Sequence, residues 1–137
     1  MNNKKKILVF TATYNEKENI ENLILNIREK LPLASILIID DNSPDGTGNK
    51  VLKIKEKVEK VIFISRSKKS GLDSAHKLAY KYSLENNFDY LISMDADFSH
   101  DPSVLPIIVQ NLKMNAFVLG SRYVDGGKCL MKGSRFI

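Results

Sequence analysis

Short apolar runs alternate with longer amphipathic stretches along the chain. The runs are rich in β-branched residues and show little alternation of polar and apolar positions, which is typical of strands covered on both faces. The pattern predicts a mostly parallel sheet of five strands, at Lys6 to Tyr14, Ser35 to Asp40, Lys60 to Ser65, Tyr90 to Asp95 and Ala116 to Ser121.

The stretches between these runs carry apolar residues at helical spacing. One apolar stripe runs from Ile20 to Leu31, and another runs from Leu72 to Tyr82. After the fourth strand, Asp101 is placed to cap a helix with Pro102 at its first position, and a fainter helical pattern follows Asp45 to Gly48. We therefore expect one open α/β domain over residues 1–137. In such sheets ligands bind beyond the carboxyl ends of the strands, where the strand order reverses.

The composition is that of a soluble globular protein. With 43% hydrophobic and 27% charged residues, the chain can bury a core and differs from a disordered tail. No apolar run approaches the roughly 20 residues that span a bilayer, and the single cysteine, Cys129, agrees with a reducing compartment. We therefore expect a cytoplasmic protein.

The net charge of +5 favours anionic partners such as nucleotides or phospholipid headgroups. The sequence has neither zinc-ligand spacing nor an RNA-binding aromatic signature, so we expect no nucleic-acid partner.

Two aspartates follow the fourth predicted strand, in the stretch LISMDADFSHDP. In an extended backbone residues i and i+2 point the same way, about 6.6 Å apart, so Asp95 and Asp97 can face one ion. Magnesium and manganese prefer oxygen ligands, and magnesium is usually bound by one or two carboxylates plus substrate phosphates. The pair therefore predicts a site for Mg²⁺ or Mn²⁺.

Other strand ends also carry charged groups. Asp40 and Asp41 close the second strand and cannot both be satisfied by the local turn, so a carboxylate there is free to accept a hydrogen bond from a nucleobase or ribose. Arg122 follows the fifth predicted strand, and its guanidinium suits bidentate contact with phosphate. For Arg66 and the KKSG after it we favour a solvated loop, and for His100 a turn or surface role and not that of a base or ligand.

Five ordered stretches give the chain a family resemblance. TYNEKENI, IIDDNSPDGT, SGLDSAHKLAY, MDADFSHDP and GSRYVDGG resemble the inverting family 2 glycosyltransferases, and within them the dolichyl- or polyprenyl-phosphate mannosyltransferase branch. The resemblance covers nearly the whole chain. It implies a GT-A fold, a Rossmann-like three-layer α/β/α architecture of nucleotide-diphospho-sugar transferases with a mostly parallel sheet.

The resemblance also implies roles for particular residues. It implies that Asp95 and Asp97 bind the metal, and that Asp97 and Arg122 act in catalysis by stabilising the leaving diphosphate. It implies a nucleotide-sugar site formed by Tyr14, Glu16, Ile39, Asp41, Asp95, Ala96, Asp97 and Arg122. Many relatives have glycine where Asp73 stands, in a loop that lies near the nucleotide sugar, and they continue well past Ile137.

The implied reaction transfers mannose from GDP-mannose to a polyprenyl or dolichyl phosphate, with inversion and metal assistance. Such an acceptor would bring the protein into peripheral contact with the cytoplasmic face of a membrane. Three alternatives stay open: a related transferase that uses UDP-glucose or UDP-N-acetylglucosamine, an inactive nucleotide-sugar-binding fragment, and a phosphoacceptor receiver domain. The receiver domain is disfavoured because its acidic pair normally follows the first strand, whereas here it follows the second.

Overall fold

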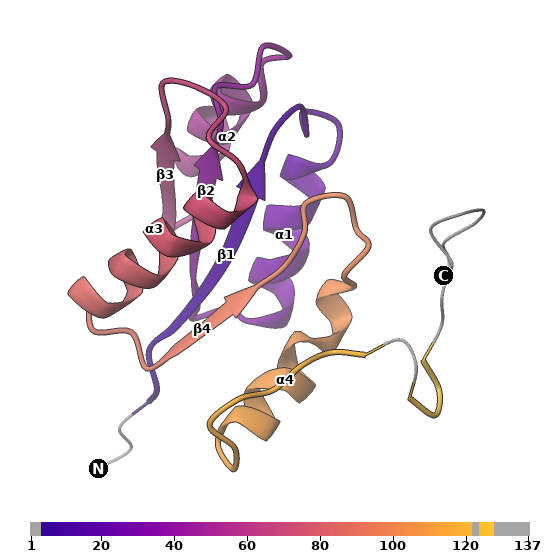
Figure 1. Cartoon of the computed structure of the whole chain (residues 1–137). Coiled ribbons are helices and arrows are strands. Elements are labelled where there is room, and N and C mark those ends of the chain that lie inside the picture. The colour runs from indigo at the N-terminus through magenta and orange to yellow at the C-terminus, as the bar shows by residue number, and fades with distance from the viewer. Residues whose placement is uncertain (1–3, 122–123, 128–137) are drawn as a thin grey trace. The chain divides into compact units, whose positions relative to one another are not determined.

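The computed structural model describes residues 4–121 and 124–127. The chain divides into two compact units, Met1–Pro106 and Ile107–Ile137. The first unit contains a parallel four-stranded sheet in the order β3-β2-β1-β4 (Figure 1). The strands are β1 (Ile7–Thr13), β2 (Ser35–Asp40), β3 (Val61–Ser65) and β4 (Tyr90–Ser93). The first four predicted strands and their parallel arrangement are confirmed.

Helices cover both faces of this sheet (Figure 1). They are α1 (Ile20–Lys30), α2 (Thr47–Lys55) and α3 (Leu72–Glu85). After β4 the chain forms the short 3₁₀ helix η1 (Pro102–Val104) and then α4 (Leu105–Leu112). Helices α1 and α2 lie together on one face, and α3 lies on the other. The predicted cap is also confirmed, since the Ser103 N–H donates to Asp101 Oδ1 at 2.9 Å.

The core follows the alternation of side chains along the strands. Under α3, Leu8 and Phe10 of β1 meet Leu37 and Ile39 of β2, all with 0% exposure, and small alanines of α3 allow the helix to approach closely. On the opposite face, the apolar stripe of α1 is fully buried, as the sequence predicts. The sheet therefore has two covered faces, and its loops are left to carry polar function.

The predicted fifth strand is wrong for the described residues. The segment from Ala116 to Ser121 has no strand pairing, and Phe117 and Leu119 are 79% and 78% exposed. An apolar, β-branched run forms a strand only where a neighbouring strand takes its backbone hydrogen bonds and its side chains are buried. Within the part of the second unit that the structure describes, this run has no neighbouring strand, and its large apolar side chains are not buried.

A carboxylate fastens the start of β1 to the start of β4. The Lys6 N–H donates to Asp89 Oδ2 at 2.7 Å, and the Lys5 ammonium lies 3.6 Å from Asp89 Oδ1. The hydrogen bond from the Lys6 backbone, helped by the charge of Lys5, lowers the pKa of Asp89 below its ordinary value. A lowered pKa in the folded state means that this stabilisation is present at neutral pH and is lost as the pH falls below about 4.

Replacing Asp89 with asparagine is therefore expected to lower the urea midpoint of unfolding at pH 7. The difference from the unmodified protein should stay constant from pH 7 to about pH 4 and narrow only below about pH 4, as the pH falls toward the lowered pKa of the native carboxylate. Urea titrations followed by circular dichroism across this pH range provide the measurement. A difference that stays constant with pH would mean that the carboxylate charge contributes nothing.

Candidate nucleotide-sugar and metal site

The strand order reverses at β1. The chain passes from β1 to β2 to β3 on one side, and β4 then joins β1 on the other side. Tyr14 follows β1, and Asp95 and Asp97 follow β4, so the predicted residues leave the two strands that flank this reversal. The carboxyl edge at a reversal is the place where open α/β sheets bind ligands.

Asp40 is a buried acid that is satisfied by its own surroundings. Its Oδ1 accepts hydrogen bonds from Thr13 Oγ1 at 2.7 Å and from Ser43 Oγ at 2.6 Å. Its Oδ2 accepts from the Ser43 N–H at 2.9 Å, and only 2% of the residue is exposed. Asp40 thus fixes the turn after β2 to the end of β1.

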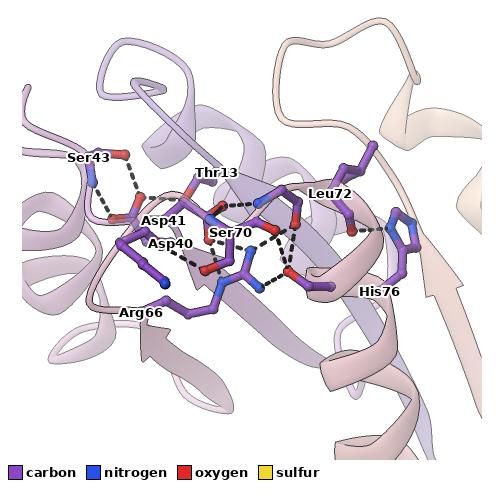
Figure 2. Close-up of polar contacts among 11 residues, drawn as sticks. Thr13, Asp40, Asp41, Ser43, Arg66, Ser70, Leu72 and His76 are labelled. Atoms are coloured by element: carbon purple, nitrogen blue, oxygen red, sulfur yellow. Dashed lines mark hydrogen bonds and ion pairs between the residues drawn. The ribbon is translucent and has the colours of Figure 1, made fainter.

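Asp41 is satisfied by a different segment, the loop between β3 and α3 (Figure 2). Its Oδ1 accepts a hydrogen bond from Arg66 Nε and forms an ion pair with Arg66 Nη2, and its Oδ2 accepts from the N–H groups of Ser70 and Gly71, both at 3.1 Å. Arg66 also donates to Ser74 Oγ and to the Gly71 carbonyl. A carboxylate has about four acceptor positions, and in this conformation three hydrogen bonds and the ion pair with Arg66 engage the carboxylate of Asp41.

Residues 67–71 are exposed, as expected of a solvated loop, but the expectation is wrong for the side chain of Arg66. Its side chain is 13% exposed, and that of Asp41 is 9% exposed. Register explains the pairing: Asp40 is the Cα partner of Ser65 in neighbouring parallel strands, so the residue after each strand stands at the same level. Opposite charges one residue past two strands would reveal the pair only once these strands are known to be neighbours.

The same loop reaches Tyr14. The Lys69 ammonium lies 4.1 Å from the centroid of the Tyr14 ring, and Tyr14 is 38% exposed. Glu16 lies at the start of α1, where its Oε2 accepts from Asn19 Nδ2 at 2.9 Å and its own N–H donates to Thr47 Oγ1 at 3.0 Å. Tyr14 and Asp41 are therefore brought together by the loop at residues 66–71.

Two other predicted site residues are buried. Ile39 has 0% exposure and packs in the core beneath α3, and Ala96 is 4% exposed. Any contribution of their side chains to a site is therefore one of packing. Arg122 lies outside the described residues.

Asp95 and Asp97 are exposed on either side of buried Ala96. The loop that carries them folds back on itself: the Ser99 N–H donates to Asp97 Oδ1 at 2.9 Å, and Ser99 Oγ donates to Asp95 Oδ2 at 3.3 Å. Hydrogen bonds from the Ser99 side chain and backbone lower the pKa of Asp97. Asp97 is thus an anion at neutral pH, as a metal ligand must be.

His100 is exposed at a bend, which agrees with the expected turn or surface role, and the residue also has a partner. Its Nδ1 accepts a hydrogen bond from the Asp95 N–H at 3.0 Å, and its Nε2 lies 3.8 Å from Asp95 Oδ2. The contact joins residues only five positions apart, so a histidine shortly after the aspartate pair was the available signal.

Comparison with known proteins decides the family. The sequence model of glycosyl transferase family 2 matches residues 8–133. The chain belongs to this family. Similar family members are the undecaprenyl-phosphate mannosyltransferase of Micrococcus luteus, 36% identical over 123 residues, and the dolichol-phosphate mannosyltransferase of Pyrococcus furiosus, 39% identical over 126 residues. These alignments cover 90% of this chain but 51% and 35% of the relatives, so the chain spans about half or less of their length.

Solved structures support the expected fold of this family 2 chain. A mannosyltransferase from Pyrobaculum calidifontis, in complex with GDP-Man and Mn²⁺, superposes with a TM-score of 0.54 at 23% identity, over 59% of this chain and 25% of its own. Glucosyl-3-phosphoglycerate synthase from Mycobacterium tuberculosis, in complex with Mn²⁺, UDP and its product, gives 0.61 at 20% identity, over 80% and 40%. Together with the parallel sheet, these likenesses confirm the α/β glycosyltransferase fold.

Asp73, where the family resemblance implies glycine, lies in the first turn of α3 and is exposed to solvent. The Asp73 side chain is 85% exposed, and its carboxylate pairs with Lys77 one turn along α3 at 2.9 Å. It therefore contacts neither Arg66 nor Asp41 among the described interactions, and its charge is offset locally.

The donor set of this family 2 chain suits a hard divalent cation. Asp95 and Asp97 supply exposed carboxylate oxygens, whereas the described residues contain no cluster of three or more acidic, histidine or cysteine side chains. Two carboxylates match an ion that keeps water and substrate phosphate oxygens as its other ligands. Within the described part of the chain, no helix has the length and apolarity that a bilayer crossing requires.

Proposed function

We propose that this chain is the nucleotide-sugar-binding domain of a metal-dependent mannosyltransferase. The donor would be GDP-mannose, and the acceptor would be a polyprenyl or dolichyl phosphate at a membrane surface, to which the protein binds peripherally. The observation that carries the proposal is the pair of exposed carboxylates, Asp95 and Asp97, directly after β4 at the strand reversal. Relatives named as polyprenyl- and dolichol-phosphate mannosyltransferases support it, as does the similar solved mannosyltransferase that contains GDP-Man and Mn²⁺.

The proposed reaction is a single displacement at the anomeric carbon with inversion. A phosphate monoester acceptor has a second pKa of about 6 and is mostly anionic at pH 7, so no strong general base is required. Asp95 and Asp97 hold Mg²⁺ or Mn²⁺, which when bound supplies charge stabilisation to the leaving diphosphate. Arg122 contributes a second positive charge to the same leaving group.

The nucleotide-sugar pocket is proposed at the carboxyl edge of β1, β2 and β4. The Tyr14 ring supplies an exposed aromatic face, and Glu16 fixes the start of α1 behind it. Asp41 shapes the pocket through its hydrogen bonds to the loop at residues 66–71. Ile39 in β2 and Ala96 after β4 are buried, and their side chains contribute packing beneath the pocket. A nucleobase that bonds to Asp41 directly would compete with the protein donors to this carboxylate.

Calorimetry with a panel of donors tests the proposal. GDP-mannose should bind in the presence of Mn²⁺, and its affinity should fall at least about tenfold when EDTA removes the metal. Stronger binding of UDP-glucose or UDP-N-acetylglucosamine would change the donor. A parallel assay with polyprenyl phosphate in detergent separates a transferase from a domain that binds the donor without transfer.

A further inference from the structure

The backbone N–H of Asp95, just past the end of β4, is a hydrogen-bond donor that has no partner in the sheet. The last backbone bond from this segment to β1 is that of the Met94 N–H to the Phe10 carbonyl, at 3.0 Å. Successive N–H groups along a strand point to opposite sides, so the Asp95 N–H points away from β1. Among the described strands β4 pairs with β1 alone, and no ladder bond reaches this group.

His100 accepts a hydrogen bond from this N–H group. Its Nδ1 accepts from the Asp95 N–H at 3.0 Å, which places the proton of a neutral ring on Nε2. That nitrogen faces Asp95 Oδ2 at 3.8 Å, so both ring nitrogens are turned toward one residue. The contact of Nδ1 is a hydrogen bond, whereas 3.8 Å is too long for one, so the ring braces the backbone of Asp95.

The brace closes a loop that would otherwise be disfavoured. Phe98, in the middle of the loop, has φ +61°, a left-handed conformation that side chains with a Cβ rarely adopt. The contacts of Ser99 with Asp95 and Asp97 lie within the loop, whereas His100 ties its far end back to the end of the strand. Without His100, the loop would lose the bond that spans it from end to end.

We propose that His100 is a positioning residue that presets Asp95 for binding a divalent cation. This inference rests on the proposed function, because it assumes that Asp95 and Asp97 hold the metal. His100 acts through the Asp95 N–H and not as a ligand. Outer groups that orient metal ligands typically change metal affinity by 10–100-fold when they are removed.

Two substitutions separate the roles of the ring nitrogens. The amide oxygen of His100→Asn stands as many bonds from the backbone as Nδ1 does, so it can accept from the Asp95 N–H. The amide of His100→Gln instead reaches the position of Nε2. His100→Ala removes both groups. Asp101→Asn is the matched control, because it alters the next residue in the chain but keeps a side chain that can cap η1.

The experiment titrates the full chain with Mn²⁺ alone and measures the free ion by electron paramagnetic resonance. We expect His100→Ala and His100→Gln to weaken Mn²⁺ binding about tenfold, whereas His100→Asn and Asp101→Asn should stay within about threefold of the unmodified protein. Amide hydrogen exchange without metal supplies a second readout: the Asp95 amide should lose protection in His100→Ala and keep it in His100→Asn.

The outcomes distinguish the two proposals. If the unmodified protein binds no Mn²⁺, or if Asp97→Ala binds it equally well, the proposed metal site is wrong and the inference built on it falls too. If Asp97→Ala loses Mn²⁺ but His100→Ala keeps both its affinity and the protection of the Asp95 amide, only the role of His100 is overturned. Rescue by glutamine and not by asparagine would also overturn it, because the action would then belong to Nε2.

Discussion

Replacement of Asp41 with alanine is expected to lower the free energy of unfolding by about 3 kcal/mol. The substitution leaves the Arg66 guanidinium, 13% exposed, without its carboxylate, and it also strands the N–H groups of Ser70 and Gly71. Removing one partner of a buried ion pair typically costs 3–5 kcal/mol, because the other charge stays buried and uncompensated. We choose the lower end because the loop at residues 66–71 borders solvent and can admit water.

Urea unfolding followed by circular dichroism measures this effect. Asp73→Ala is the matched control, since it removes an exposed carboxylate two residues after the same loop, and it should change stability by no more than about 0.5 kcal/mol. A loss below about 1 kcal/mol for Asp41→Ala would show that Arg66 and the loop amides find other partners at little cost.

Replacement of Asp97 with alanine is expected to lower the kcat/KM of mannosyl transfer by about 100-fold or more, if the proposed function is correct. The variant loses one of two carboxylate ligands, and a bound metal supplies several kcal/mol of charge stabilisation to a leaving diphosphate. Because hydrogen bonds from Ser99 lower the pKa of Asp97, its charge should stay constant between about pH 6 and pH 8. Any change of Mn²⁺ affinity over that range then has another source.

Transfer from labelled GDP-mannose to polyprenyl phosphate measures the effect of Asp97→Ala. Glu85→Gln is a suitable control, since Glu85 lies at the end of α3 with a side chain 60% exposed. Transfer by Asp97→Ala at the rate of the unmodified protein, with the same dependence on Mn²⁺, would contradict a metal role for this carboxylate.

Local patterns sufficed for much of the fold. Four apolar runs could be recognised as strands because they show little alternation of polar and apolar residues, and the stripe of α1 was visible because its residues repeat at helical spacing. Of these strands β1 and β2 are buried on both faces, whereas β3 and β4 are partly exposed. The run from Ala116 to Ser121 has the same composition but forms no strand. A strand depends on a neighbour that its own sequence does not contain.

For the site too, spacing along the chain informs only about residues that are close in sequence. The prediction that Asp95 and Asp97 face one ion assumes an extended backbone, whereas Ala96 and Asp97 lie in a turn, and the metal role of the two aspartates stays a prediction. The partner of Asp41 could not be predicted from spacing, because Arg66 lies 25 residues away and meets it only once β2 and β3 are in register. Ile39 illustrates a further limit: a residue can belong to a motif while its side chain lies in the core.

The position of β4 has a consequence for the order of folding. Strand β1 is made first, yet its contact with β4 joins residues 83 positions apart at Lys6 and Asp89. Contacts between residues that are distant in the sequence form slowly, because the entropy of closing a long loop is lost before the contacts form. We therefore expect the pairing of β4 with β1 to come late, both during synthesis on the ribosome and in refolding. Substitutions at Asp89 should then accelerate unfolding and leave the rate of folding nearly unchanged.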